Sequence, residues 1–254
     1  MPNSQSRFVW HHLATSDVDA AKSFYTQILP WKTQPWELDE NYTVFVNNDE
    51  PLGGVRPLES ELKARGIAPH WMPYVCVYDV DACSRQVKTL GGQLRMGPVE
   101  VANGGCWAVV TDPQGAAIGL FEPEGRAPGH DGQPRRGEFS WHELMTTDYK
   151  AAAEFYRAVF HWEKTSEFDM GEAGIYSMFG KGGRIYGGMF NKPPHETASW
   201  LSYARVDDVK GLAETVKRLG GNVIHGPTEV PGGDWIVACT DPQGASFALH
   251  MVKA

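Results

Sequence analysis

The sequence is poor in cysteine and in long apolar runs. Four cysteines occur in 254 residues and none of them forms a CxxC pair, which argues against a disulfide scaffold and predicts a reducing, cytoplasmic environment. No apolar run approaches the ~20 residues that a membrane helix needs. The opening MPNSQSRF lacks a basic-then-apolar pattern, so we expect no secretory signal and no membrane association.

Positive charge is also scarce. Lys and Arg number 23 against 31 Asp and Glu, a formal net charge of −8. An acidic chain has no bulk attraction for nucleic acid or for an anionic membrane surface, so neither is an expected partner. GxSxG, P-loop and GxGxxG motifs do not occur in a suitable context, so nucleotide chemistry is not indicated.

What the chain does contain is an internal repeat. Three stretches of the first half return in the second half: Phe8–Trp31 as Phe139–Trp162, Trp71–Gly92 as Trp200–Gly221, and the string TDPQGA at Thr111–Ala116 and Thr240–Ala245. In the first pair 11 of 24 positions are identical at an offset of 131, and the other two pairs have an offset of 129. Nearly constant spacing over most of each half predicts two copies of one domain.

A segment rich in Pro, Gly and charge separates the copies. Residues 123–138 read PEGRAPGHDGQPRRGE, a composition typical of a linker and unsuited to building a core. We therefore predict a first domain at residues 1–124, a linker at 125–137 and a second domain at 138–254.

Each copy has a doubled local pattern. A predicted strand at Phe8–Ala14 leads to Asp17, a candidate helix N-cap, and apolar residues then follow with helical spacing. Strand-like segments come next, and the same order begins again near Tyr74, with its helix ending at the pair Gly91-Gly92. The predicted fold class is α+β, with two βαβββ modules per copy and four in the chain.

These motifs resemble those of the vicinal oxygen chelate superfamily. A strand, then D-x-x-x-A-x-x-F-Y, then GG, then D-P-x-G before a last strand is its pattern, and W-H-[HE]-L-x-T resembles a subgroup of two-copy glyoxalase-like proteins. The superfamily includes glyoxalase I, extradiol dioxygenases, fosfomycin-resistance proteins and bleomycin-binding proteins. The resemblance implies tandem domains whose sheets form open cups, each with a small-molecule site. It leaves a monomer and a homodimer both open.

The resemblance also implies a divalent metal, yet its ligand positions hold unsuitable residues. Metal-dependent members use His and Glu side chains at three places in each domain. Here those places hold Trp10, Met72 and Gly119 in the first copy, and Trp141, Leu201 and Ala248 in the second. None of these side chains suits a hard or borderline ion. We therefore predict no cofactor, with a displaced divalent metal near His12 and His70 as the alternative.

Strand alternation predicts which other side chains line each cup. Residues two apart share a face, so His12 joins Trp10 and Glu143 joins Trp141. The predicted ligand-binding residues are Trp10, His12, Met72, Tyr74, Phe121, Trp141 and Leu201. The predicted catalytic residues, all in the second copy, are Glu143, Tyr203 and His250. In the alternative interpretation the two tryptophans fill the space of metal and substrate, and the polar groups serve binding or the surface.

One histidine recurs at the same place in both copies, and we expect its side chain on the opposite face of the strand from the cup. His11 and His142 alternate with the cup-lining positions, so we expect them to face the helices and to make structural contacts. The repeated TDPQGA is interpreted as a turn signal that needs no chemistry.

Three functions follow from these observations. The first is a protein that binds, and in one version transforms, a small metabolite or antibiotic without the family's metal. The second is a metal-dependent glyoxalase-like lyase or dioxygenase with displaced ligands. The third is a non-catalytic pseudo-dimer scaffold. Whether the chain is an enzyme stays open at the level of sequence.

Overall fold

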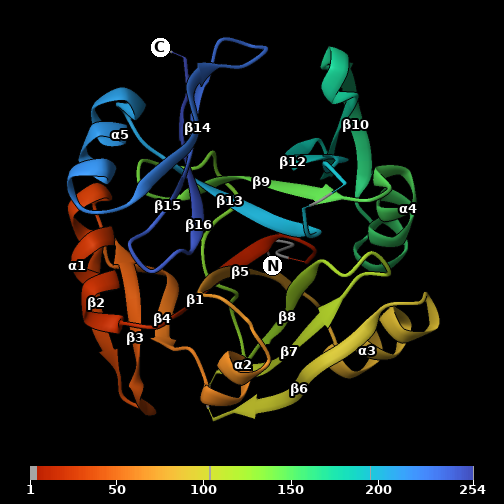
Figure 1. The fold of residues 1–254 in the computed structure, drawn as a ribbon. Helices are drawn as coiled ribbons and strands as arrows, with labels where there is room; N and C mark the ends of the chain where they lie inside the picture. Colours follow the sequence, from red (N-terminus) through yellow and green to blue (C-terminus); the bar gives the residue numbers. More distant parts are fainter. Residues whose placement is uncertain (1–4, 103, 195, 254) are drawn as a thin grey trace. The chain divides into compact units, whose positions relative to one another are not determined.

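Four βαβββ modules follow one another in the computed structural model, which describes residues 5–102, 104–194 and 196–253 (Figure 1). The first copy contains β1 (Phe8–Thr15), α1 (Val18–Ile28), β2 (Lys32–Trp36), β3 (Asp39–Asn47) and β4 (Glu50–Pro57), then β5 (His70–Cys76), α3 (Val80–Thr89), β6 (Gln93–Val101), β7 (Gly105–Thr111) and β8 (Ala117–Pro123). The short α2 (Ser60–Ala64) between the modules was not predicted, nor was β2, which carries a proline.

The second copy repeats this order. It contains β9 (Phe139–Thr146), α4 (Tyr149–Phe160), β10 (Glu163–Asp169), η1 (Gly171–Ala173), β11 (Ile175–Lys181) and β12 (Arg184–Asn191), then β13 (Ser199–Arg205), α5 (Val209–Arg218), β14 (Asn222–Glu229), β15 (Trp235–Thr240) and β16 (Ser246–Met251). None of the helices in the described residues is long and apolar enough to cross a membrane.

Each copy builds one eight-stranded mixed sheet. The strand orders are β2-β3-β4-β1-β5-β8-β7-β6 and β10-β11-β12-β9-β13-β16-β15-β14. In every module the first strand pairs in parallel with the last, as β1 does with β4 and β9 with β12, because a helix crosses over between them. Within each module, the second, third and fourth strands pair with one another in antiparallel fashion. The predicted α+β class with four βαβββ modules is confirmed.

The helices begin and end at the predicted signals. The Asp17 carboxylate accepts a hydrogen bond from the Ala20 N–H at 3.0 Å, which satisfies one of the backbone donors left free in the first turn of α1. Asp148 does the same for α4. Gly91 and Gly220 follow α3 and α5 with φ of +89° and +87°, a conformation that a side chain would strain.

Packing divides the chain differently from the repeat. Unit 1 holds the residues up to Trp10, Met72–Asp131 and Trp141–Leu201, and unit 2 holds His11–Trp71, Gly132–Ser140 and the chain from Ser202 onward. Unit 1 therefore combines the second module with the third, and its core contains side chains of α3 and α4. Unit 2 combines the first module with the fourth, and its core contains side chains of α1 and α5. The domain boundaries expected from the repeat remain a prediction.

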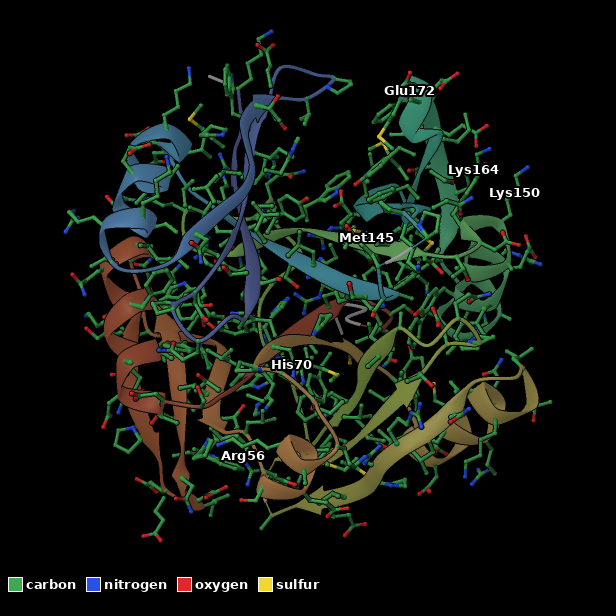
Figure 2. All side chains as sticks on the ribbon, viewed as in Figure 1. Arg56, His70, Met145, Lys150, Lys164 and Glu172 are labelled. Carbon is green, nitrogen blue, oxygen red and sulfur yellow. The ribbon has the colours of Figure 1, made fainter. Side chains whose placement is uncertain are left out.

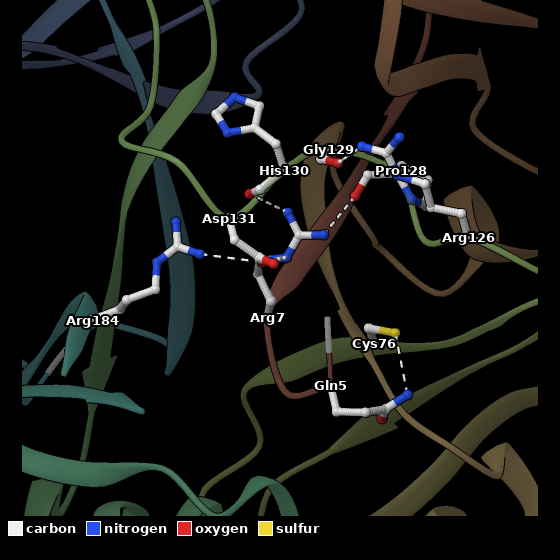
Figure 3. Close-up of polar contacts among 9 residues, drawn as sticks. All are labelled: Gln5, Arg7, Cys76, Arg126, Pro128, Gly129, His130, Asp131 and Arg184. Carbon is white, nitrogen blue, oxygen red and sulfur yellow. Dashed lines mark hydrogen bonds and ion pairs between the residues drawn. The ribbon is translucent and has the colours of Figure 1, made fainter. Parts of the chain in front are cut away.

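The segment expected to be a linker is held to both units by hydrogen bonds. In unit 1 the Arg7 guanidinium donates to the carbonyl oxygens of His130 at 2.6 Å and Pro128 at 2.9 Å, and Asp131 pairs with both Arg7 and Arg184 (Figure 3). Burial lowers the pKa of Arg7, and Asp131 opposes that shift.

In unit 2 the indole N–H of Trp31 donates to the Gly137 carbonyl at 2.7 Å, and the Asn47 amide donates to the Arg136 carbonyl at 2.8 Å. These contacts use backbone carbonyls, so they give the linker a defined path although its composition could not form a core.

Candidate functional site

The six positions that correspond to the family's metal ligands lie on strands, as predicted. Trp10 on β1 and Trp141 on β9 are half-buried, as are Met72 on β5 and Leu201 on β13. Gly119 and Ala248 on the last strands are buried. None of the six offers a donor that Zn²⁺, Fe²⁺ or Mn²⁺ would accept. Within the described residues, no group of three or more His, Cys, Asp and Glu side chains is placed to hold an ion. The donor set therefore does not fit the family's metal.

A hydrogen-bonded chain of three side chains stands at this position in the second copy. The Trp141 indole N–H donates to the Tyr176 hydroxyl at 2.8 Å, and that hydroxyl donates to Oε2 of Glu143 at 3.0 Å. Trp141 and Glu143 come from β9, two residues apart on one face, and Tyr176 comes from β11. The predicted pair Trp141 and Glu143 is thus brought together through a third residue that the sequence analysis did not identify.

The ring of Tyr176 packs directly over Gly188 on the neighbouring strand β12. A Cβ atom at Gly188 would stand 1.9 Å from a ring carbon of Tyr176, so the neighbouring strand must carry a glycine here. Burial, and then the nearby Glu143 carboxylate, raise the pKa of Tyr176 well above its ordinary value, so the hydroxyl stays protonated and acts as a donor. The glycine pair Gly187-Gly188 in β12 was the available signal in the sequence.

The first copy has a different pair at the related position. His12 Nδ1 lies 3.3 Å from the Tyr42 hydroxyl and the two rings stack, while Gly54 makes room for Tyr42. Burial, and then the charges of Arg56 and His70, lower the pKa of His12 to about 3. Arg56 and His70 are labelled in Figure 2. A cationic neighbour that disfavours imidazolium also disfavours a divalent cation, which weakens the alternative of a displaced metal at His12 and His70.

The remaining predicted ligand-binding residues of the first copy lie in unit 1. The ring of Tyr74 on β5 covers Gly119 on β8, where an added Cβ would stand 2.2 Å from the ring. Tyr74 also contacts Trp107 edge to face. Phe121 packs on a small apolar cluster that contains Val9 and Cys76. These contacts of Tyr74 and Phe121 are made with aromatic and apolar side chains.

The three predicted catalytic residues fall into different compact units. Glu143 belongs to unit 1, with the partners described above, whereas Tyr203 and His250 belong to unit 2. Tyr203 is buried, with 3% of its surface exposed. His250 on β16 bonds to Ser140 and Asp234, neither of which the sequence analysis identified.

The recurrent histidines make stacking contacts. His142 lies parallel to Phe8 in unit 1, and His11 lies parallel to Phe139 in unit 2, each with ring centroids 3.6 Å apart. Both histidines are buried. Burial lowers the pKa of His142 to about 3, so its ring is neutral at pH 7. Both residues stack in the apolar interior rather than in a polar site.

Two buried relays link the repeated motifs. In unit 1 the Trp200 N–H donates to the Tyr156 hydroxyl at 3.2 Å, which donates to Oδ2 of Asp112 at 3.1 Å. In unit 2 Trp71, Tyr25 and Asp241 make the same contacts at 2.8 and 3.0 Å. The aspartates belong to the TDPQGA strings, where their Oδ1 atoms also accept backbone N–H groups of the turn. These strings therefore do more than form a turn, because each supplies a buried carboxylate.

Comparison with known proteins follows the same division into copies. The model of the family described as Glyoxalase/Bleomycin resistance protein/Dioxygenase superfamily matches residues 7–120 and 139–249. The protein named "Putative glyoxylase CFP32" of Mycobacterium bovis is 31% identical over 249 residues, which cover 94% of this chain and 92% of that protein. The anthracycline biosynthesis protein DauV of Streptomyces sp. is 29% identical over 260 residues, with 94% and 91% covered.

Solved structures show the same fold at lower identity. A Mn(II)-bound glyoxalase from Novosphingobium aromaticivorans superposes with a TM-score of 0.64 at 16% identity, covering 98% of this chain and 82% of that one. Homoprotocatechuate 2,3-dioxygenase from Brevibacterium fuscum, in complex with 3,4-dihydroxyphenylacetate, gives 0.69 at 12% identity, covering 100% and 83%. At such identities the likeness concerns the fold alone.

Proposed function

This chain belongs to the Glyoxalase/Bleomycin resistance protein/Dioxygenase superfamily, and from that premise we propose that its second copy binds a small aromatic or carbonyl-bearing metabolite without the family's metal. The observation that carries the proposal is the chain of hydrogen bonds from Trp141 through Tyr176 to Glu143, and the resemblance implies a metal ligand at the position of Trp141. A carboxylate held by an aromatic donor is suited to recognise a hydroxyl or amine of a ligand.

The surroundings of this set favour a flat, apolar ligand. Tyr176 stacks with Phe168 at 5.3 Å and with Phe190 at 5.9 Å between ring centroids, and Trp141 adds a half-buried indole. Aromatic rings give large contact area and specific stacking geometry. Two relatives are named for anthracycline biosynthesis, and anthracyclines are polycyclic aromatic ketones. These names also favour an aromatic ligand.

The polar hydrogens of Trp141 and Tyr176 point at acceptors within the set, which favours ligand binding over the polarisation of a substrate oxygen that a metal ion performs. Trp141 and Tyr176 have one polar hydrogen each, and both are used within the set. These hydrogens are therefore not available to polarise a ligand carbonyl as a metal ion would, so a carbonyl-bearing ligand would be held here through its apolar and aromatic surface. Glu143 is the member that can take part in proton transfer, which keeps its predicted catalytic role, and those of Tyr203 and His250, within the proposal. The predicted ligand-binding roles of the first copy, at Trp10, His12, Met72, Tyr74 and Phe121, and that of Leu201 in the second, belong to it as well.

A reducing compartment belongs to the same proposal. The four cysteines are all free thiols, and burial raises the pKa of Cys83 and Cys239 to about 12, which makes these two unreactive.

The test is calorimetric titration of chelator-treated protein with a polycyclic hydroxyquinone probe. We expect binding to persist after chelation and to weaken by ~10- to 100-fold in Glu143→Gln, because a hydrogen bond to a charged acceptor contributes ~1.5–3 kcal/mol. Glu229→Gln, the same substitution at an exposed residue of β14 in the second copy, is the matched control and should leave this affinity unchanged.

Two results would contradict the proposal. Binding or turnover that appears only after Zn²⁺, Mn²⁺ or Fe²⁺ is restored would favour the metal-dependent alternative. Equal affinity of Glu143→Gln, Trp141→Phe and unmodified protein for the probe would place binding elsewhere and favour a scaffold.

A further inference from the structure

Ser140, His250 and Asp234 form a hydrogen-bonded row in unit 2. The Ser140 hydroxyl oxygen lies 2.9 Å from His250 Nδ1, and His250 Nε2 lies 3.0 Å from Oδ2 of Asp234. The three residues come from β9, β16 and the turn before β15, so 110 residues separate the serine from its histidine. This is the order of contacts, hydroxyl to imidazole to carboxylate, that activates a serine nucleophile, with the two ring nitrogens exchanged relative to the commonest arrangement.

The protons of the row can be assigned from its partners. The Asp234 carboxylate has no proton to give, so the Nε2 proton of His250 points at it and the Nδ1 lone pair faces Ser140. The Ser140 hydroxyl then donates to Nδ1. Its other acceptor in reach, the Tyr203 carbonyl oxygen, lies farther away at 3.3 Å.

Neighbouring groups keep the carboxylate charged and fixed. The Lys253 backbone N–H donates to Oδ1 of Asp234 at 2.8 Å. Burial by itself would raise the pKa of Asp234, but this N–H, His250 and the charge of Arg205 together hold that pKa below its usual value. Arg205 is also the direct cross-strand partner of His250. The Arg205 guanidinium donates to the Pro134 carbonyl, and its charge acts on Asp234 from there.

The row is sheltered but open to solvent. The side chain of His250 is 12% exposed and that of Asp234 is 33% exposed, and Ser140 is half-buried. This partial burial strengthens the hydrogen bonds of the row.

The first copy provides an internal comparison. The positions that the repeat aligns with Ser140, His250 and Asp234 hold Val9, Phe121 and Gly105. Val9 and Phe121 pack there with Cys76 and Ala127 in an apolar cluster. Since the fold at this place is satisfied by an apolar cluster in one copy, folding alone does not require the polar row of the other.

We propose that Ser140 is a nucleophile, activated by His250 and Asp234, which cleaves small carboxylic esters. The hydroxyl oxygen of Ser140 bonds to the ester carbonyl carbon as its proton moves to Nδ1 of His250. Collapse of the tetrahedral intermediate breaks the carbon–oxygen bond to the alcohol, which takes that proton. Water, deprotonated by His250, then attacks the acyl group and releases the acid, and the proton returns to Ser140.

The experiment treats the intact protein with a fluorophosphonate and locates the modified peptide by mass spectrometry, alongside hydrolysis of p-nitrophenyl butyrate. We expect Ser140 to be modified, and the modification to disappear in His250→Asn. We expect ester hydrolysis to fall by ~100-fold or more in Ser140→Ala, within the range seen when a member of a serine triad is removed. Ser246, exposed on the same strand as His250, supplies the control Ser246→Ala, which should behave as the unmodified protein.

Failure has a clear form. An unmodified Ser140 in folded protein, or equal modification with and without the His250 imidazole, would overturn the proposal. So would ester hydrolysis that survives Ser140→Ala. Because the labelling is done on unmodified protein, a variant that fails to fold does not protect the proposal from this outcome. The proposed metabolite site at Glu143 is tested separately, and its failure would leave the labelling of Ser140 unaffected.

Discussion

Replacing Tyr156 by Phe removes one oxygen from the middle of a buried relay. Tyr156 has no exposed surface, and its hydroxyl joins the Trp200 N–H, 3.2 Å away, to the Asp112 carboxylate, 3.1 Å away. Asp112 is 2% exposed. The ring itself stays in place in Phe, so the perturbation is confined to two hydrogen bonds and leaves the packing of α4 intact.

The magnitude follows from the kind of bond lost. A hydrogen bond to a charged acceptor is worth ~1.5–3 kcal/mol and an ordinary one ~1 kcal/mol, so the variant should lose about 2–4 kcal/mol of unfolding free energy at pH 7. That is a large share of the ~5–15 kcal/mol that stabilises a typical domain.

The loss should depend on pH in a definite direction. Burial raises the pKa of Asp112 above its ordinary value, and the Tyr156 hydroxyl opposes that shift. A carboxyl whose folded pKa is raised binds protons more readily in the folded state, so its ionisation costs stability as pH rises above ~3.8. Without the hydroxyl this cost increases. The difference between Tyr156→Phe and the unmodified protein should therefore be largest at pH 7 and shrink toward pH 4.

Urea unfolding followed by circular dichroism at pH 7 and pH 4.5 measures both effects. Tyr78→Phe, at a side chain that is 75% exposed, is the matched control and should change stability by no more than a few tenths of a kcal/mol. A loss below ~1 kcal/mol at pH 7, or one that does not depend on pH, would refute the account of a charged relay.

Three further predictions concern other parts of the fold. Burial lowers the folded pKa of His142 to about 3, so the contribution of this residue to the unfolding free energy is complete above pH ~6.5 and falls by ~1.4 kcal/mol per pH unit below it. His142→Phe should remove that part of the pH dependence in urea unfolding, whereas His225→Gln should not. Gly188→Ala should displace Tyr176, cost ~1–3 kcal/mol in urea unfolding and weaken probe binding measured by calorimetry. Residues 138–254 alone should not form a folded monomer in light scattering and circular dichroism, because both compact units need the other copy.

Much of the local structure could be predicted from the sequence. The caps at Asp17 and Asp148 and the helix stops at Gly91 and Gly220 depend on neighbours within a few residues, so the pattern alone identifies them. The two copies, each with a doubled local pattern, then predict four modules in the chain.

The candidate site was only partly predictable. Alternation along β9 placed Trp141 and Glu143 on one face, but Tyr176 lies 33 residues from Glu143 on another strand. Ser140 was missed because its histidine lies 110 residues away, and nothing near Ser140 in sequence distinguishes it. Side chains that are close only in space leave no periodic signal.

The sequence by itself determined that each copy carries a Trp, a Tyr and an Asp in fixed motifs. Through the resemblance it also predicts that the family's metal ligands are replaced. It could not determine which partners meet, because the motifs of the two copies are the same and either pairing would satisfy them. The tertiary structure decided that Tyr25 bonds Asp241 and Tyr156 bonds Asp112, each across copies. The physical reason is packing: α1 shares a core with α5, and α3 with α4, and burial of these helices carries each tyrosine to the turn of the other copy.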